Sequence, residues 1–236
     1  MGYVDTLQSW QKRNIDQLID TMDKLGIRDD FTQASVLAVI SKESAFRPQA
    51  ERSYKNTSAD RIKSIFGKYI NDLTTSEIDQ LKQDDVAFFN KVYGGRYGNA
   101  SNEGYKFRGR GYNQLTFKSN YKSLSDQVGI DLVSDPDKLA DPKIASKVAV
   151  KYFLSRFKSG FDEAKQYHYN ADHINDFTNV VDSTLAVYHA NAGFNKPLFT
   201  VSQATSTGGL EKALDRAPDL LKYVEDYHKK KNESES

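Results

Sequence analysis

The sequence predicts a mainly helical protein: one bilobed domain with a small β element that lines a cleft. Apolar residues recur at helical spacing over most of the 236 residues. Many of the 14 glycines instead gather in residues 94–117, interleaved with tyrosine and phenylalanine, a composition typical of turns and short strands. No internal repeat or low-complexity linker divides the chain. We therefore expect a single domain over residues 1–236, with its core at about 10–228.

The N-terminal part contains two expected helices. The first covers residues 10–25, with Gly26 available as its C-cap. The second is capped by Asp30 or Thr32 and runs to about Ser44, and it is apolar nearly all round, which is typical of a buried core helix. Pro48 is expected to end it, because the residue before a proline is pushed away from helical angles.

Further helices are expected on both sides of the glycine-rich segment. A capping-box-like Thr57-x-x-Asp60 predicts a helix to Tyr69, with Ile62, Ile65 and Phe66 facing inward. Thr74 or Thr75 begins a short helix. The other expected helices cover residues 85–93, 119–128, 142–157, 173–189 and 218–230. A capped loop is expected at residues 130–142, and a frayed polar tail at residues 229–236.

Composition excludes several classes of function. Lys and Arg number 33 against 32 Asp and Glu, so the net charge of +1 gives no electrostatic argument for nucleic acid. The chain has no cysteine, which excludes disulfides, cysteine–zinc sites and a thiol nucleophile. The histidines lack metal-ligand spacing, and the aspartates of residues 131–141 fit helix caps better than a calcium loop. We predict no metal and no cofactor.

The N-terminus also bears on where the protein is expected to act. It has no basic segment followed by an apolar one, so we expect a chain made in the cytoplasm without a signal peptide. The longest apolar run, residues 36–40, is far shorter than the roughly 20 residues of a membrane span. We expect no stable membrane insertion. Nothing in the sequence signals oligomerisation, and a monomer is expected.

Glu43 is the first candidate for chemistry. It shares a helix face with Val36, Val39 and Ile40, so burial of its side chain is expected. Burial disfavours the charged form of a carboxylate, and enzymes obtain a general acid for neutral pH in this way. The same pattern also fits a Glu43 that turns to water or pairs with Lys42.

A second carboxylate and an aromatic wall complete the candidate site. Glu51 lies beyond Pro48 on a loop, and an acid on a helix with a base on a loop is a layout that a two-carboxylate glycosidase needs. Aromatic rings with neutral hydrogen-bonding groups such as Gln114, Thr116 and Asn120 suit a sugar. An aromatic core with structural glycines fits the segment equally well.

Two motifs resemble those of family 19 glycoside hydrolases, which comprise plant-type chitinases and many phage and bacterial endolysins. Residues 39–46 resemble the catalytic-helix motif, and residues 107–121 (Phe-Arg-Gly-Arg-Gly-Tyr-Asn-Gln-Leu-Thr-Phe-Lys-Ser-Asn-Tyr) resemble the second, longer signature. Residues 131–142 resemble the loop after it, and residues 191–195 resemble a substrate-binding turn. The resemblance covers about residues 10–225, with motif spacing nearer the endolysins. It implies a lysozyme-like fold.

The resemblance implies a role for each matching residue. Glu43 would be the general acid, Glu51 the base for water, and Thr116 would help to hold that water. The sugar cleft would be lined by Tyr105, Arg110, Tyr112, Gln114, Asn120 and Asn191. The family inverts the anomeric centre in one displacement, with carboxyl groups about 6.5–9.5 Å apart. Lys42 and Ala192 depart from the family pattern, which usually has His and Gly there.

The expected function is that of an endolysin: cleavage of β-1,4 bonds in peptidoglycan glycan strands for host lysis, after holin-dependent release to the cell wall. Three alternatives stay open. One is a chitinase acting on chitin oligomers. Another is an inactive sugar-binding or virion protein of the same fold, motivated by Lys42 and Ala192. The third is a lytic transglycosylase with one catalytic glutamate.

Overall fold

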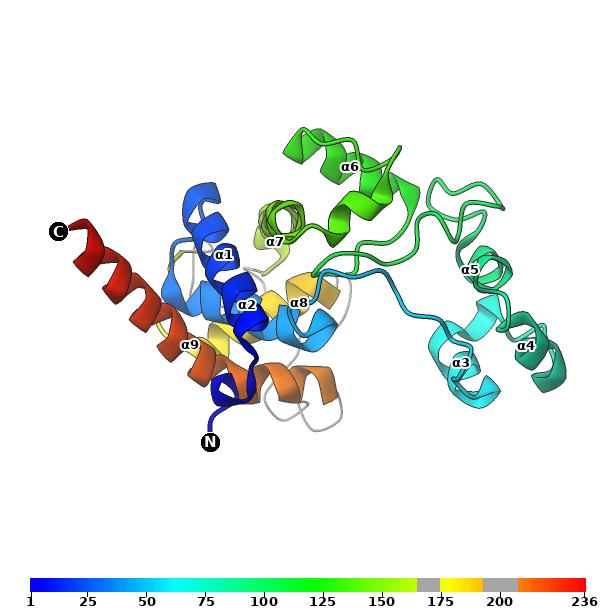
Figure 1. Ribbon diagram of the computed structural model, residues 1–236, viewed down its shortest axis with the longest axis horizontal. Coiled ribbons are helices and arrows are strands. Elements are labelled where there is room, and N and C mark those ends of the chain that lie inside the picture. The colour runs from blue at the N-terminus through cyan, green and yellow to red at the C-terminus, as the bar shows by residue number, and fades with distance from the viewer. Residues whose placement is uncertain (165–174, 193–207) are drawn as a thin grey trace. The chain divides into compact units, whose positions relative to one another are not determined.

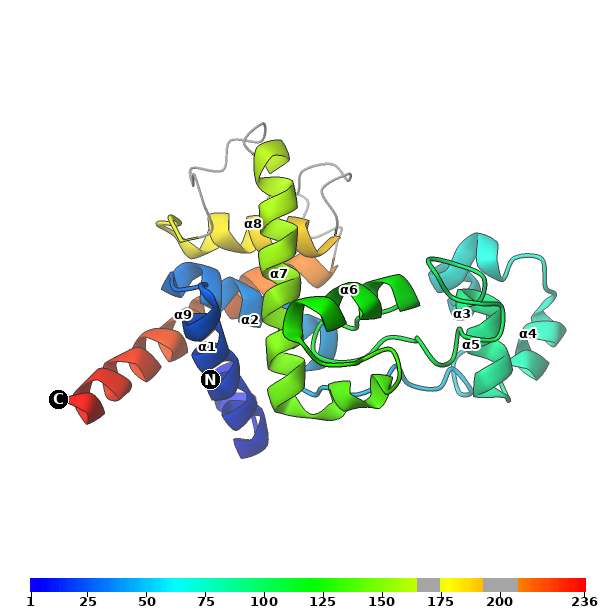
Figure 2. The same ribbon diagram turned by 90° about the horizontal axis from the view of Figure 1, so that it is seen from above.

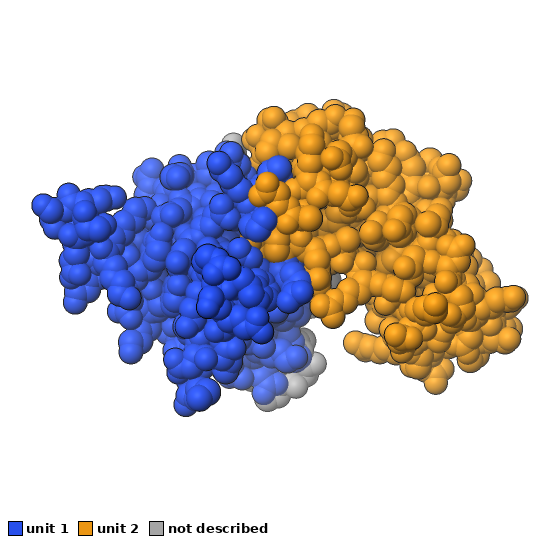
Figure 3. All heavy atoms as spheres, viewed as in Figure 1, with its two compact units in different colours: residues 1–47, 142–236 blue, residues 48–141 orange. Residues whose placement is uncertain are grey.

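The computed structural model describes residues 1–164, 175–192 and 208–236 and divides into two compact units. Unit 1 contains Met1–Arg47 and Pro142–Ser236, and unit 2 is Pro48–Asp141 (Figure 3). Unit 2 is therefore one continuous insertion into the sequence of unit 1. That residues 1–236 form one catalytic domain stays a prediction.

Unit 1 is built around a buried central helix, α2 (Asp30–Ser44), which packs mainly against α9 and α8 (Figures 1 and 2). Every residue of α2 from Thr32 to Ser41 is buried, as the apolar pattern predicted. The other elements of unit 1 are η1 (Val4–Thr6), α1 (Ser9–Leu25), α7 (Pro142–Ala164), α8 (Val180–Ala192) and α9 (Gly208–Glu235).

The polar residues of α2 find partners inside the unit. Ser35 Oγ lies 2.6 Å from Ser183 Oγ of α8, and Gln33 Nε2 donates to the Ile27 carbonyl at 2.7 Å. The N-cap is Asp29, whose side chain accepts from the Phe31 N–H, and not Asp30 or Thr32 as predicted. These bonds pair the hydroxyl group of Ser35 and the amide nitrogen of Gln33 inside a nearly enclosed helix, and the buried Gln33 Oε1 atom is left without a hydrogen-bond partner.

Backbone conformation, and not proline, ends α2. Ala45 and Phe46 have φ angles of 50° and 62°, in the left-handed region that non-glycine residues seldom occupy. The helix therefore stops at Ser44, before the predicted influence of Pro48 begins. Gln11 and Asn14 of α1 donate to the carbonyls of Ala45 and Phe46, and so hold this strained turn just after Glu43.

Unit 2 is organised by an aromatic core. Phe66, Phe88 and Phe89 are buried together with Ile62 and Ile78, and Tyr54, Tyr93 and Tyr105 pack against them. Its elements are α3 (Ala59–Phe66), η2 (Gly67–Tyr69), α4 (Thr75–Leu81), α5 (Asp85–Tyr93), α6 (Lys118–Val128) and η3 (Pro136–Ala140). The cap of α3 is Ser58 rather than Thr57, and Ile65 is 43% exposed rather than inward.

The glycine-rich segment is irregular, as predicted. Within the described residues the β structure amounts to one isolated bridge between Arg110 and Leu115. Gln114 and Phe117 take positive φ angles of 52° and 74°, which bend the chain back on itself. The mainly helical fold is thus confirmed.

The C-terminal helix departs most from the prediction. α9 begins at Gly208, ten residues earlier than expected, and contains Pro218. It continues to Glu235, so the predicted frayed tail is helical. His228 contacts Asp23 and Asp30, and Lys231 Nζ lies 2.9 Å from Asp20 Oδ1, so side chains of α1 and α2 hold this end in place. No helix in the described ranges is long and apolar enough to cross a membrane.

The N-cap of α2 gives a test of this packing. Replacing Asp29 with Ala removes the acceptor for the Phe31 N–H and the Thr32 hydroxyl. We expect the free energy of unfolding to fall by about 1 kcal/mol in urea titrations. Asp215→Asn, an exposed change on α9, should alter it by less than about 0.5 kcal/mol. Equal effects of the two changes would contradict the capping role.

Candidate active site

Glu51 forms a reciprocal pair with Gly109 in unit 2. Its backbone N–H donates to the Gly109 carbonyl at 2.7 Å, and the Gly109 N–H donates to Glu51 Oε2 at 3.3 Å. The loop after Pro48 and the glycine-rich segment, 58 residues apart in sequence, are joined at this point. Glu51 is therefore held through both its backbone N–H and its side-chain carboxylate.

Two phenols complete the surroundings of the Glu51 carboxylate. Tyr54 OH donates to Oε1 at 2.9 Å, and Tyr93 OH lies 3.1 Å from both oxygens. The ring of Tyr54 stacks on Phe88 and the ring of Tyr93 on Phe89, with centroids 5.1 and 6.0 Å apart. The aromatic core of unit 2 therefore orients both hydroxyl groups toward the Glu51 carboxylate.

Burial and hydrogen bonding act on Glu51 in opposite directions. Burial raises the pKa of the Glu51 carboxyl, while the bonds from Tyr54, Tyr93 and Gly109 and the charge of Arg108 lower it, and the net shift is upward. Burial and the nearby Glu51 charge raise the pKa of both tyrosines, so each stays a protonated donor. The site thus holds a carboxyl group of increased basicity whose ionised form is still solvated by three donors.

Gly109 is the point where the predicted residues of unit 2 meet. A Cβ atom added there would lie 3.0 Å from Gln114 Oε1, 3.2 Å from Glu51 Oε2 and 3.4 Å from Thr116 Oγ1. The three side chains therefore surround one small space that only glycine leaves open. Thr116 Oγ1 donates to the Gln114 carbonyl at 3.0 Å, which leaves its oxygen lone pairs as acceptors.

Glu43 lies in unit 1 at the last turn of α2. Its side chain is 22% exposed, so it is half-buried and not enclosed as predicted. Lys42 Nζ contacts Oε1 at 3.0 Å, and Asn191 Nδ2 of α8 donates to the same oxygen at 3.2 Å. Lys42 is exposed to solvent and still reaches Glu43 in this ion pair. Of the predicted substrate turn at 191–195, residues 193–195 lie outside the described residues.

The exposed Lys42 side chain lies close to Tyr188 of α8 and Gly209 of α9. Its Nζ is 5.9 Å from the centre of the Tyr188 ring. A Cβ on Gly209, at the start of α9, would lie 2.6 Å from Lys42 Cε. A glycine at this position is what leaves room for the lysine beside Glu43.

Several predicted sugar contacts have structural roles instead. The ring of Tyr112 is fully buried in the core and presents no face to a ligand. Arg110 is 5% exposed, and its guanidinium donates to the Lys106 and Arg108 carbonyls and to Asp137. Both predictions are therefore corrected, because Tyr112 is enclosed in the core and Arg110 holds the loop that carries Gly109.

The remaining candidates differ in their exposure. Gln114 Nε2 donates to the Gln49 and Gly111 carbonyls, which ties its loop to the segment before Glu51. Asn120 is exposed, and its amide bonds the Thr116 carbonyl one turn earlier. Tyr105 is half-buried under the Arg108 guanidinium, 3.9 Å from the ring centre. Their contact with a substrate stays a prediction.

Sequence reasoning missed the two phenols on Glu51. Tyr54 follows Glu51 by three residues, but Tyr93 is 42 residues away, and no local spacing indicates that contact. Within the described ranges no group of three His, Asp or Glu side chains is placed to hold a metal ion.

Comparison with known proteins supports the family resemblance, although the range matched by the family model contains neither Glu43 nor Glu51. A family model described as chitinase class I matches residues 84–162, which include Tyr93, Gly109 and Thr116. A glycosyl hydrolase family 19 domain-containing protein of Haemophilus influenzae is 31% identical over 140 residues. That match covers 56% of this chain and 66% of the relative, so it spans slightly less than two thirds of the relative's length.

The raised pKa of Glu51 predicts how stability depends on pH. Above the ordinary value of 4.5, the native carboxyl binds its proton more tightly than the unfolded chain does, so ionising it costs folding free energy. Glu51→Gln does not titrate. The stability of the wild type relative to Glu51→Gln should therefore fall as pH rises from about 4.5, and then level off above the native pKa. Urea unfolding of both proteins across this pH range measures the difference in stability. A wild type that becomes more stable relative to Glu51→Gln as pH rises would contradict a raised pKa of Glu51.

The corrected role of Arg110 gives a second test. Arg110→Ala leaves buried carbonyls without donors and should lower the free energy of unfolding by about 2–4 kcal/mol. Asp137 is the matched control, because its side chain is 78% exposed although it pairs with Arg110. Asp137→Asn should cost less than about 1 kcal/mol. A stable Arg110→Ala protein would restore Arg110 as a candidate for ligand binding.

Proposed function

Because this chain belongs to glycoside hydrolase family 19, a family of chitinase-like glycoside hydrolases, we propose that it hydrolyses β-1,4 glycosidic bonds next to N-acetylglucosamine. The observation that carries the proposal is the Glu51 carboxylate, which is partly buried and hydrogen-bonded yet has a raised pKa, beside the Thr116 hydroxyl. A base that activates water near neutral pH needs such a combination.

The chemistry of the base follows from its hydrogen bonds. A carboxylate accepts at about four positions, and Glu51 receives three donors, which leaves room for one water. That water donates one hydrogen to Glu51 and the other to the Thr116 oxygen, whose own hydrogen is engaged with the Gln114 carbonyl. A lone pair of the water oxygen is then directed at the anomeric carbon.

Glu43 is proposed as the acid. It gives its proton to the glycosidic oxygen as the C–O bond breaks, while the water that Glu51 deprotonates forms the new bond from the opposite face. The product has inverted configuration, Glu51 holds the proton from water, and Glu43 is left ionised. Asn191 and Lys42, both on Glu43 Oε1, hold the carboxylate that results.

We propose peptidoglycan glycan strands as the substrate, with chitin oligomers second. The support is the endolysin-like spacing of the motifs, in which Glu51-Arg52-Ser53-Tyr54 takes the place of the loop glutamate segment. The protein would then be made in the cytoplasm and act on the cell wall after release.

The central experiment compares glutamate variants on purified peptidoglycan and on chitin oligomers. Glu43→Gln and Glu51→Gln should each lower the rate by at least about 10²-fold, because each removes a proton transfer. Glu211→Gln, an exposed change on α9, is the matched control and should keep full activity. Circular dichroism should show that all three variants are folded.

Product mass spectrometry separates the alternatives. Reducing ends indicate hydrolysis, and anhydro-muramic ends indicate a lytic transglycosylase. Binding of glycan without cleavage by the wild type would indicate the inactive sugar-binding protein and would refute the enzyme.

A further inference from the structure

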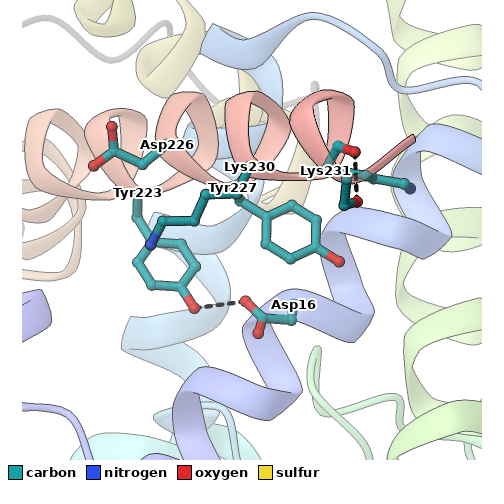
Figure 4. A pocket seen from close by; sticks show the side chains of 7 residues that line it. Asp16, Tyr223, Asp226, Tyr227, Lys230 and Lys231 are labelled. Atoms are coloured by element: carbon teal, nitrogen blue, oxygen red, sulfur yellow. Dashed lines mark hydrogen bonds between the residues drawn. The ribbon is translucent and has the colours of Figure 1, made fainter. Parts of the chain in front are cut away.

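A cavity of about 490 Å³ lies between α1 and α9 in unit 1, and neither Glu43 nor Glu51 lines it (Figure 4). This volume falls within the range of ligand pockets. The side chains that matter below are Asp16 of α1 and Tyr223, Asp226, Tyr227, Lys230 and Lys231 of α9.

Two tyrosine rings form the apolar part of the wall. Tyr223 and Tyr227 are four residues apart and so share one face of α9, and Figure 4 shows both rings projecting toward α1. Tyr223 OH donates to Asp16 Oδ1 at 2.5 Å, and the Tyr227 hydroxyl is hydrogen-bonded to Asp20. Because hydrogen bonds hold both hydroxyl groups, the rings are already oriented before a ligand binds. This lowers the entropy cost of binding.

The charges around the cavity are balanced. Asp16 and Asp226 line the cavity together with Lys230 and Lys231, and Lys231 is paired with Asp20 at 2.9 Å. A balanced set gives little attraction for an anion or a cation. It does offer carboxylate acceptors and ammonium donors close together, beside flat apolar rings. That combination suits the hydroxyl groups and C–H faces of a neutral sugar.

The cavity is separate from Glu43. His228, one residue after Tyr227, contacts Asp30 at the start of α2 at 2.9 Å. Glu43 lies near the other end of α2, about 20 Å from Asp30 along the helix at 1.5 Å per residue, and neither Lys42 nor Asn191, which contact Glu43, lines the cavity. A ligand in the cavity therefore does not occupy the surroundings of Glu43.

We propose that this cavity is a second, non-catalytic binding site for a neutral oligosaccharide containing N-acetylglucosamine. The identity of the sugar rests on the proposed function, whereas the site itself rests on the rings and charges. Such a site keeps the protein on a polymer between cleavage events, because a second contact raises the effective concentration of the glycan at the first.

The test uses the full chain with Glu43→Gln, so that the ligand is not consumed, and with ¹³C-labelled tyrosine. Titration with the tetramer of N-acetylglucosamine should shift the Tyr223 and Tyr227 signals in a saturable way. Lys230→Ala should weaken this binding by at least about fivefold, roughly 1 kcal/mol. Lys229→Ala is the matched control, since the neighbouring lysine does not line the cavity, and it should bind as before. Salt should leave the affinity unchanged, because the ligand is neutral.

Signals of Tyr223 and Tyr227 that do not move, equal losses in Lys229→Ala and Lys230→Ala, or binding that weakens steeply with salt would each overturn the proposal. Its failure is distinct from failure of the proposed function. Glycan cleavage together with unshifted tyrosine signals contradicts the second binding site but not the proposed function. Saturable shifts without any cleavage by the wild type support the second site and contradict the proposed enzymatic function.

Discussion

The reciprocal pair between Glu51 and Gly109 is the constraint on which the rest of the candidate site depends. It needs a glycine, because a Cβ at position 109 would crowd the Glu51 carboxylate, Gln114 and Thr116 together. It also needs a fixed loop, which the Arg110 guanidinium supplies by donating to neighbouring carbonyls. Arg110, which the sequence predicted as a sugar ligand, is thus part of the frame that positions Glu51.

The aromatic core of unit 2 serves the same constraint. Burying a carboxylate costs free energy unless donors replace the lost water. Tyr54 and Tyr93 provide two of these donors, and their rings are held by stacking on Phe88 and Phe89. Replacement is incomplete, so the pKa of Glu51 stays raised. Ionising Glu51 therefore costs folding free energy, and the carboxylate binds a proton more tightly than an exposed one does.

Local patterns predicted the helices well and the site only in part. The periodicity of residues 30–44 indicated a buried helix, and Thr74 marked the start of α4, because both signals are contained within a few residues. The left-handed turn at Ala45 is set by contacts from α1, and the burial of Tyr112 by tertiary packing. The Tyr93–Glu51 bond joins residues 42 apart, which spacing does not reveal.

The most direct measurement is a pH titration of the Glu51 side-chain carbon by ¹³C NMR in the wild type and in Tyr93→Phe. The wild-type pKa should lie above the ordinary value of 4.5. Loss of the Tyr93 hydroxyl should raise it further, because that bond favours the ionised form. A wild-type value at or below 4.5, or a lower value in Tyr93→Phe, would contradict the account of Glu51 as a buried base held by phenol donors.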